Sequence, residues 1–298
     1  MIGKTVLVTG GAGFIGSHIV EELANNNTVY VMDDLFTGRL FNLDKCIQKI
    51  NYVKGSLLDA ELLGVLVNKA DVIFHEAARL SSGVCQVNAY PLAEANILGT
   101  INLLEACRKH PVERVVVASS AAVYGQTNHE VDEYEDLLPI SFYGISKMVM
   151  ETYCTQYYIN YGIPVTILRY FNVYGPRQNA AYAAVLCNFM QAYRAKRKLV
   201  IYGDGEQTRD FISVKDVVKA NILAAEKDTA LGQIFNVASG KSITLNELSR
   251  LFGNNAEYQE KTEVDITYSS ANINKARRLL GFNPSQEIDL SWCDYGDI

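Results

Sequence analysis

The sequence predicts an α/β fold in which a doubly wound parallel sheet is followed by a smaller, mixed α/β lobe. Short runs rich in β-branched residues alternate with longer stretches of helical period up to about residue 170, which is typical of a parallel sheet covered by helices. A glycine-rich turn directly follows the first run and leads into a helical stretch. After about residue 170 the pattern loosens into short mixed elements, with no long linker before them.

Strands and helices mostly alternate along the first part. The expected strands are residues 5–9, 28–33, 51–54, 72–75, 114–119 and 165–169. The expected helices between them are residues 14–25, 59–68, 88–109 and 143–161. This order favours a doubly wound sheet.

The second part has a turn at residues 203–205 and expected helices near residues 215–227, 245–252 and 272–280. We expect residues 1–171 to form the first domain, with residues 211–237 returning to it. Residues 172–210 and 238–298 should form the smaller lobe. A ligand cleft between the two is expected beyond the carboxyl ends of the strands.

Composition excludes several classes of protein. The chain has 298 residues, 49% of them hydrophobic, without a run long enough to cross a bilayer or a secretion signal with a cleavage site. The net charge of -6 includes no basic block, so sequence-independent nucleic-acid binding is not expected. The six cysteines have no close pair and the four histidines do not cluster, so neither disulfides nor a metal site are expected. A soluble, cytoplasmic protein is the resulting prediction.

The turn after the first strand has the pattern of a dinucleotide site. In TGGAGFIGSH, Gly10, Gly13 and Gly16 allow a tight turn and a close approach of the backbone to a pyrophosphate at the helix N-terminus. Asp33 ends the next strand, where its carboxylate can accept hydrogen bonds from adenosine ribose and would repel a 2′-phosphate. A Rossmann-like domain that binds NAD is therefore predicted. Alternatively, the glycines only close a helix against the sheet and Asp33 caps a turn.

Tyr143 and Lys147 stand four residues apart in YGISK, so they share one face of the expected helix. A free tyrosine has a pKa of about 10, but a neighbouring ammonium and a positive nicotinamide ring would stabilise its phenolate as a base. Ser120, at the end of the strand that closes in VVVASS, is placed to hold the hydroxyl that reacts. The alternative is a solvated helix face in a chain with 18 tyrosines.

An ordered series of motifs extends these features along nearly the whole chain. The series is TGGAGFIGSH, DDLFTG, HEAA, NILGTINLLEA, SSAAVYG, YGISK, RYFNVYGPRQ, YGDGEQTRDFISVKDV and NVASG. In order and spacing it resembles the extended short-chain dehydrogenase/reductase family, in its NAD-dependent sugar epimerase/dehydratase branch.

The resemblance implies that Asp59 touches the adenine and that Asn96 lies beside the dinucleotide. Ser120, Tyr143 and Lys147 would be the catalytic set. Besides Tyr143 and Lys147, the expected cofactor contacts are Gly10, Gly13, Phe14, Ile15, Gly16, Asp33, Asp34, Gly38, Leu58, Asp59, Ala77, Ala78 and Asn96. The expected contacts of a UDP-sugar substrate are Ser82, Ser120, Tyr143, Asn172, Arg209 and Ser269.

Asn172 and Arg209 are expected to hold the diphosphate, because arginine offers a fixed fork of donors to phosphate oxygens. The alternative for Arg209 is a surface ion pair with Asp210 or Asp204. The family usually has a second arginine before a Gly-Asp pair, where this chain has Thr262, and Lys261 is a candidate substitute. The last family helix also looks short or lost in the tail SWCDYGDI.

The resemblance also bears on the reaction. Dehydratases and decarboxylases of this branch carry an acidic residue just after the catalytic hydroxyl, where this chain has Ala121 and Ala122. We therefore expect 4-epimerisation of a UDP-hexose through a 4-keto sugar, with NAD kept bound. The alternatives are an NDP-sugar 4,6-dehydratase or another NDP-sugar modifier, and a non-catalytic dinucleotide-binding protein, which would typically lack the Tyr or the Lys.

Ser269 falls where the family sets the size of the sugar substituent. A serine should leave room for an N-acetyl group, so UDP-GlcNAc and UDP-GalNAc are expected beside UDP-Glc and UDP-Gal. The alternative is that Tyr268 closes the same space. The family also implies a homodimer built from residues 88–109 and 143–161, unless the apolar stripes of these helices simply face the sheet.

Overall fold

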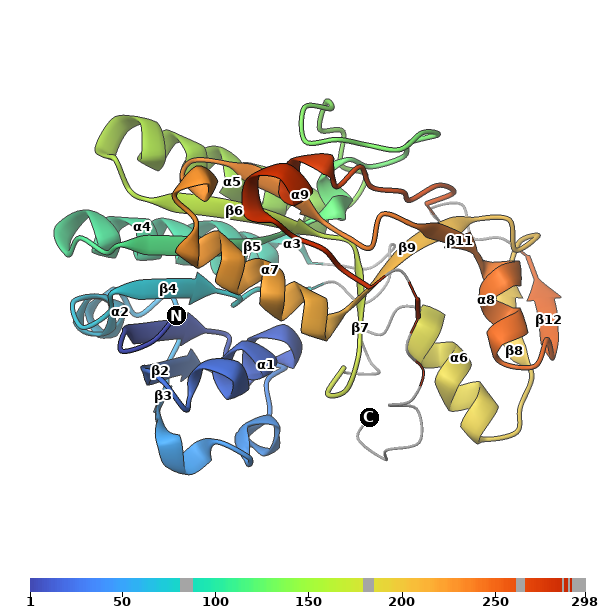
Figure 1. Ribbon diagram of the computed structural model, residues 1–298, viewed down its shortest axis with the longest axis horizontal. Coiled ribbons are helices and arrows are strands. Elements are labelled where there is room, and N and C mark those ends of the chain that lie inside the picture. Colours follow the sequence, from blue (N-terminus) through green and yellow to red (C-terminus); the bar gives the residue numbers. More distant parts are fainter. Residues whose placement is uncertain (81–87, 179–184, 261–265, 286, 289, 291–298) are drawn as a thin grey trace.

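The computed structural model describes residues 1–80, 88–178, 185–260, 266–285, 287–288 and 290. Its centre is a seven-stranded sheet in the order β10-β6-β5-β4-β1-β2-β3, in which every neighbouring pair is parallel (Figure 1). The strands are β1 (Thr5–Thr9), β2 (Thr28–Asp33), β3 (Ile50–Lys54), β4 (Val72–His75), β5 (Arg114–Ser120), β6 (Val165–Tyr170) and β10 (Ile234–Val237). The predicted doubly wound sheet is confirmed.

Helices cover both faces of this sheet, which explains why its strands are apolar on both sides. In β1, Val6 and Val8 belong to the core beneath α1 (Phe14–Leu23), α7 (Val214–Glu226) and α9 (Asn274–Leu280). Leu7 points to the opposite core, beneath α2 (Ala60–Val67), α4 (Gly99–Lys109) and α5 (Phe142–Tyr161). The alternation of side chains along a strand therefore divides one apolar run between two cores.

The sequence predicted one helix over residues 88–109, but this stretch is not a uniform α-helix. It consists of α3 (Ala89–Leu92), a π-helical segment (Ala93–Leu98) and α4. Asn96 lies in the π-helical segment and is buried. Such segments are rare and often occur at functional sites.

The smaller lobe contains two further sheets beside two helices (Figure 1). The three-stranded sheet has the order β11-β9-β7, and the other pairs β12 with β8. The bounds are β7 (Asn172–Tyr174), β8 (Leu199–Tyr202), β9 (Thr208–Ser213), β11 (Ser242–Thr244), β12 (Ala256–Gln259), α6 (Val185–Arg194) and α8 (Leu245–Leu251). The sequence did not resolve these strands or α6, because short strands in a mixed lobe carry no clear period.

The chain returns to the large sheet after β9, since β10 pairs in parallel with β6 and α7 packs into the core beneath β1. The predicted helices near residues 215–227, 245–252 and 272–280 correspond to α7, α8 and α9. The exact division into two domains stays a prediction. Within the described residues, no helix combines the length and the apolar character that crossing a membrane would need.

Candidate active site

A cavity of about 600 Å³ opens where β1, β2, β4 and β5 end. Its wall combines the glycine turn, residues after β2 and β4, the last residues of β5 and the first two turns of α5. Of the residues expected to contact the cofactor, it is lined by Gly10, Gly13, Phe14, Ile15, Gly16, Asp33, Asp34, Leu58, Ala77, Ala78, Tyr143 and Lys147.

The glycine turn is shaped by close backbone contacts. Gly10 has a φ of 69°, which is accessible to glycine at little cost. A Cβ at Gly10 would lie 2.6 Å from the backbone nitrogen of Ala77, so the turn and the segment after β4 approach closely only without a side chain. Gly13 is the N-cap of α1 and offers no side chain to its amides. The free N–H groups of that helix end are suited to a pyrophosphate.

Asp33 both fixes the turn and faces the cavity. Its carboxylate accepts hydrogen bonds from the amides of Ala12 at 2.9 Å and Leu35 at 2.8 Å. Burial raises the pKa of this carboxyl, and the two amide bonds oppose that shift. Gly38 does not line the cavity. It packs against the Asp33 carboxylate, and a Cβ at Gly38 would lie 2.6 Å from Oδ1 of Asp33. Asp33 therefore does cap a turn, as the alternative supposed, yet it remains exposed to a ligand.

Two expected cofactor contacts, Asp59 and Asn96, do not line this cavity. The Asp59 carboxylate instead caps α2 by accepting from the amide of Leu62 at 3.0 Å. Ser56 and Leu57, with Leu58, line the wall in its place. An acidic N-cap is favoured by the free amides of the first helical turn, and this local role accounts for the carboxylate.

Asn96 also lies behind the wall. Its amide accepts from the backbone N–H of Arg79 at 2.7 Å and donates to the carbonyl of Arg79 at 3.0 Å. It also donates to the Ser146 hydroxyl at 2.9 Å. Asn96 therefore ties the segment after β4 to α5, beside Lys147, and acts on the site by positioning it.

The three residues expected to be catalytic come together at one end of the cavity. Ser120, the last residue of β5, is hydrogen-bonded to the phenol of Tyr143. Ser141 caps α5 by accepting from the amide of Gly144 at 3.0 Å, which sets where the helix begins. The ammonium of Lys147 donates to the carbonyl of Ala118 at 2.7 Å.

Burial dominates the electrostatics of this group. It raises the pKa of Tyr143 to about 12, while the hydrogen bond to Ser120 lowers it. Burial also lowers the pKa of Lys147 to about 8. The Lys147 ammonium donates to a backbone carbonyl, and the cationic ring of bound NAD would add positive charge that favours the phenolate.

A smaller cavity of about 170 Å³ lies on the other side of this group. Ser120 lines it, and Tyr170 lines both cavities, so the two meet there. Besides Ser120, its wall contains three more of the residues expected to bind the sugar nucleotide: Asn172, Arg209 and Ser269. Ser82, Lys261 and Thr262 lie outside the described residues.

Contacts within the smaller cavity hold its polar side chains in place. The amide of Asn172 donates to the carbonyl of Asp210 at 3.0 Å and to the hydroxyl of Ser269 at 3.5 Å. The Arg209 guanidinium donates to the carbonyls of Thr208 at 2.8 Å and Ile266 at 2.7 Å. Asp210 accepts from Ser239 and Gly240. Tyr268 shares the wall with Ser269.

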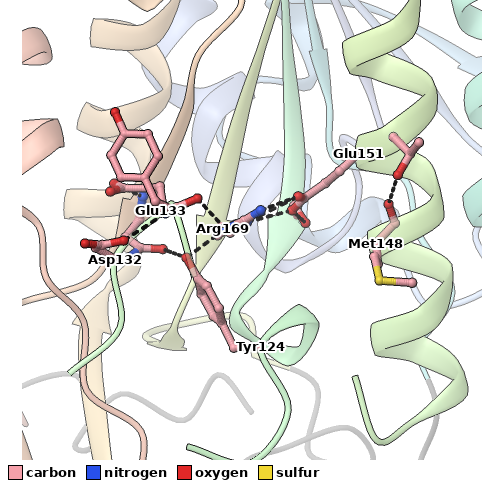
Figure 2. A network of polar contacts seen from close by, with 10 residues as sticks. Tyr124, Asp132, Glu133, Met148, Glu151 and Arg169 are labelled. Atoms are coloured by element: carbon pink, nitrogen blue, oxygen red, sulfur yellow. Dashed lines mark hydrogen bonds and ion pairs between the residues drawn. The ribbon is translucent and has the colours of Figure 1, made fainter. Parts of the chain in front are cut away.

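A buried polar network connects Arg169 with Glu151 and Tyr124 (Figure 2). The Arg169 guanidinium donates to both carboxylate oxygens of Glu151, with the shortest N–O distance at 2.7 Å, and to the hydroxyl of Tyr124 at 2.9 Å. Glu151 also accepts from the hydroxyl of Ser119 at 2.5 Å. The network therefore joins α5, β5 and β6 within one turn of Lys147 and one residue of Ser120.

Five charged residues of the larger cavity were not predicted from the sequence: Arg39, Glu76, Arg79, Glu94 and Arg177. Arg79 forms an ion pair with Asp34 at 2.7 Å, and its guanidinium carbon lies 3.5 Å from the centre of the Phe36 ring. Arg177 forms an ion pair with Glu21 on α1. Glu76 and Arg177 stand in the quoted HEAA and GPRQ motifs, which were the available signal.

These features define a class: a dinucleotide-dependent enzyme whose nucleotide cavity ends at a Ser-Tyr-Lys group. Residues 6–238 match the NAD dependent epimerase/dehydratase family. The chain belongs to this family, and NAD is its cofactor. Two features fit that cofactor. The turn at Gly10 leaves no room for a side chain, and the Asp33 carboxylate stands at the end of β2.

Known proteins of several activities are similar to the chain. A UDP-N-acetylglucosamine 4-epimerase of Methanobrevibacter ruminantium, solved with UDP-N-acetylmuramic acid, has a TM-score of 0.90 at 39% identity and covers 96% of this chain and 94% of its own. A UDP-glucose 4-epimerase of Thermotoga maritima, solved with UDP-glucose, has a TM-score of 0.89 at 34% identity over 96% and 94%. A UDP-N-acetyl-alpha-D-glucosaminuronate decarboxylase of Bacillus cytotoxicus is 38% identical over 83% of this chain and 78% of its own.

Proposed function

We propose that this protein is an isomerase that interconverts UDP-hexoses at C4 through a 4-keto intermediate, with NAD kept bound throughout. The observation that carries the proposal is the composition of the smaller cavity. Its described lining residues include Ser120, Asn172 and Arg209 but no Asp or Glu. Such a wall suits a reaction that needs no acid or base beyond Tyr143.

Each residue of the site has its own role in the proposed 4-epimerisation. The Ser120 hydroxyl holds the 4-hydroxyl of the sugar, and the Tyr143 phenolate accepts its proton. Bound NAD would accept the hydride from C4 of the sugar and later give the hydride back. Lys147 contributes positive charge beside the phenolate, and Asn172 and Arg209 hold the UDP diphosphate while the 4-keto sugar turns. Tyr143 then gives back the proton when hydride reaches the opposite face.

A 4,6-dehydratase or a uronate decarboxylase is the competing reading, and one of the similar proteins is a decarboxylase. Ala121 and Ala122 line the smaller cavity directly after Ser120. An alanine can neither remove nor donate a proton, so these positions favour epimerisation. The product distinguishes the readings, since an epimer keeps the mass of its substrate whereas loss of water or carbon dioxide does not.

We propose that the sugar includes N-acetylated hexoses, UDP-GlcNAc and UDP-GalNAc, beside UDP-Glc and UDP-Gal. Ser269 supports this, because its small side chain lines the smaller cavity within hydrogen-bonding reach of Asn172. Tyr268 lines the same wall and is the residue that would exclude the acetyl group if it turned inward. Turnover measured with all four UDP-sugars decides whether Ser269 admits the acetyl group or Tyr268 excludes it.

We further propose a homodimer in the cytoplasm. Several large apolar side chains of α5 are exposed, among them Ile145, Tyr153 and Ile159, and a second copy would cover them. Residues of α4 and α5 already lie side by side, since the Tyr157 hydroxyl donates to Glu105 at 2.7 Å. In the part of the chain that the structure describes, Cys46, Cys107 and Cys154 are buried thiols, which suits a reducing compartment.

The Tyr143→Phe variant tests the catalytic assignment. It should lose interconversion by at least about a hundredfold, as is typical when an acid-base group is removed, while it keeps bound NAD. Released nucleotide, measured after denaturation, checks the second point. The Ser146→Ala variant, on the same helix turn, should keep far more activity. Normal turnover in the Tyr143→Phe variant would refute the role.

A further inference from the structure

Glu76 is a partly buried acid at the end of the larger cavity that borders the smaller one. It directly follows β4 and lines the larger cavity with Tyr143, Lys147 and Tyr170. The Tyr170 hydroxyl donates to its carboxylate at 2.8 Å. Tyr170 in turn lines both cavities, so this carboxylate lies at the end of the cofactor cavity that faces the sugar.

The surroundings hold the carboxylate firmly. The amide of Asn221 on α7 donates to the Tyr170 hydroxyl at 2.8 Å and to the carbonyl of Val217 at 2.9 Å. The backbone N–H of Glu76 donates to the carbonyl of Thr9 on β1 at 3.1 Å. A negative charge fixed in this way acts strongly, because the buried site has a low effective dielectric constant.

Neither the proton transfer nor the hold on the diphosphate uses this acid. Its charge opposes ionisation of Tyr143 and favours the ammonium form of Lys147. Glu76 therefore makes the Tyr143 phenolate harder to form, which points to a role for this carboxylate outside proton transfer. The nicotinamide ring must reach the Ser120 and Tyr143 end of the cavity, and it carries a positive charge only in its oxidised form.

We propose that the Glu76 carboxylate makes the site prefer oxidised over reduced cofactor, by pairing with the positive charge of the nicotinamide ring. The preference keeps the resting protein ready to oxidise a sugar. It also favours return of the hydride to the 4-keto sugar, so that the intermediate is short-lived. The inference rests on NAD as the cofactor and not on which sugar reacts.

The test compares cofactor preference in the holoenzyme and in the Glu76→Gln variant. Each protein is equilibrated with mixtures of free NAD and NADH until the bound ratio is constant, and the bound nucleotides are then released and separated. Glutamine keeps an oxygen that can accept from Tyr170 but removes the charge. The bound NADH:NAD ratio should rise about tenfold in the variant, in line with the loss of a nearby charge.

The Asp34→Asn variant is the matched control. Asp34 is a second carboxylate of the same cavity, after β2 rather than β4. It follows Asp33, the residue expected at the adenosine ribose, and the adenosine half is identical in both forms of the cofactor, so its loss should alter the ratio by less than about twofold. An unchanged ratio in Glu76→Gln, or an equal change in both variants, would overturn the proposal.

A second measurement needs no substitution. Burial raises the pKa of Glu76 to about 7, so its charge is present above that pH and lost below it. The bound NADH:NAD ratio of the unaltered protein should therefore rise as the pH falls from about 7.5 to about 6. Within the described residues, Lys147, Tyr143 and Tyr170 are the titratable groups that face Glu76. The pKa of Lys147 is lowered to about 8, so its titration overlaps the upper part of this range, and a rise caused by Glu76 should be absent from the Glu76→Gln variant. A flat ratio over this range would contradict the inference, and because no sugar is present, neither result depends on 4-epimerisation.

Discussion

At the scale of single residues, the site combines side chains that serve both the fold and the chemistry. Asp33 accepts from two backbone amides and still faces the cavity. Asn96 clamps the backbone of Arg79 and reaches the hydroxyl next to Lys147. Substitutions at such positions alter stability and cofactor binding together, so a clean functional test needs residues with fewer structural contacts.

Ser269 is such a residue, and it gives a prediction about sugar size. The Ser269→Tyr variant should lose at least about tenfold in kcat/KM for UDP-GlcNAc, because a ring fills the space that an acetyl group needs. Activity on UDP-Glc should change by less than about threefold. Steady-state kinetics with both substrates measure the ratio, and Thr127→Ser, at another lining position, serves as the control. Equal losses on both sugars would mean that position 269 does not sense the substituent.

At the scale of elements, α5 determines where the chemistry takes place. Its cap at Ser141 sets the first turn, which carries Tyr143, and the next turn brings Lys147 against the end of β5. One turn further, Glu151 joins the pair with Arg169 of β6, where both side chains are only 3% exposed (Figure 2). The register of α5 on the sheet is therefore held by a buried ion pair.

That pair yields a prediction about stability. The Glu151→Leu variant leaves the Arg169 guanidinium buried without its carboxylate, which should cost about 3–5 kcal/mol. The double variant Glu151→Leu/Arg169→Met removes both charges and should recover most of the loss. Urea denaturation at one fixed NAD concentration measures both. If the single variant proved as stable as the double, the ion pair would not be what holds α5.

At the scale of the whole molecule, two sheets meet around one reacting centre. The large sheet supplies the cofactor cavity, and β7 and β9 of the smaller lobe supply Asn172 and Arg209 to the other cavity. Ser120, Tyr143 and Lys147, proposed to be catalytic, lie on the border between them. In the proposed function, cofactor and substrate would be bound by different parts of the chain, and Tyr170 lines both cavities.

The proposed dimer can be tested at this scale. Tyr153 is 41% exposed on α5, and a charge there would be buried by a second copy at high cost. The Tyr153→Glu variant should sediment as a monomer near 33.1 kDa, whereas the unaltered protein should sediment at twice that mass. Tyr258→Glu, on the distant strand β12, should remain a dimer. A monomeric unaltered protein, or a dimeric Tyr153→Glu variant, would contradict the proposed interface.

The sequence alone was sufficient for features whose physical cause is local. A strand followed by Gly10, Gly13 and Gly16 is a property of neighbouring residues, and so is the shared face of Tyr143 and Lys147. The parallel sheet followed from alternating periods along the chain. The resemblance to a known family was carried by the same local motifs, in order.

Only the tertiary structure decided roles that depend on which distant segments approach each other. Asp59 was expected at the adenine, but its carboxylate is taken up by the end of α2. Glu76 became significant only because Tyr170, 94 residues later, reaches its carboxylate and borders both cavities. The strands of the smaller lobe and the pairing of β10 with β6 depend likewise on distant partners. Periodicity and motifs describe neighbours in the chain, whereas burial and pairing depend on neighbours in space.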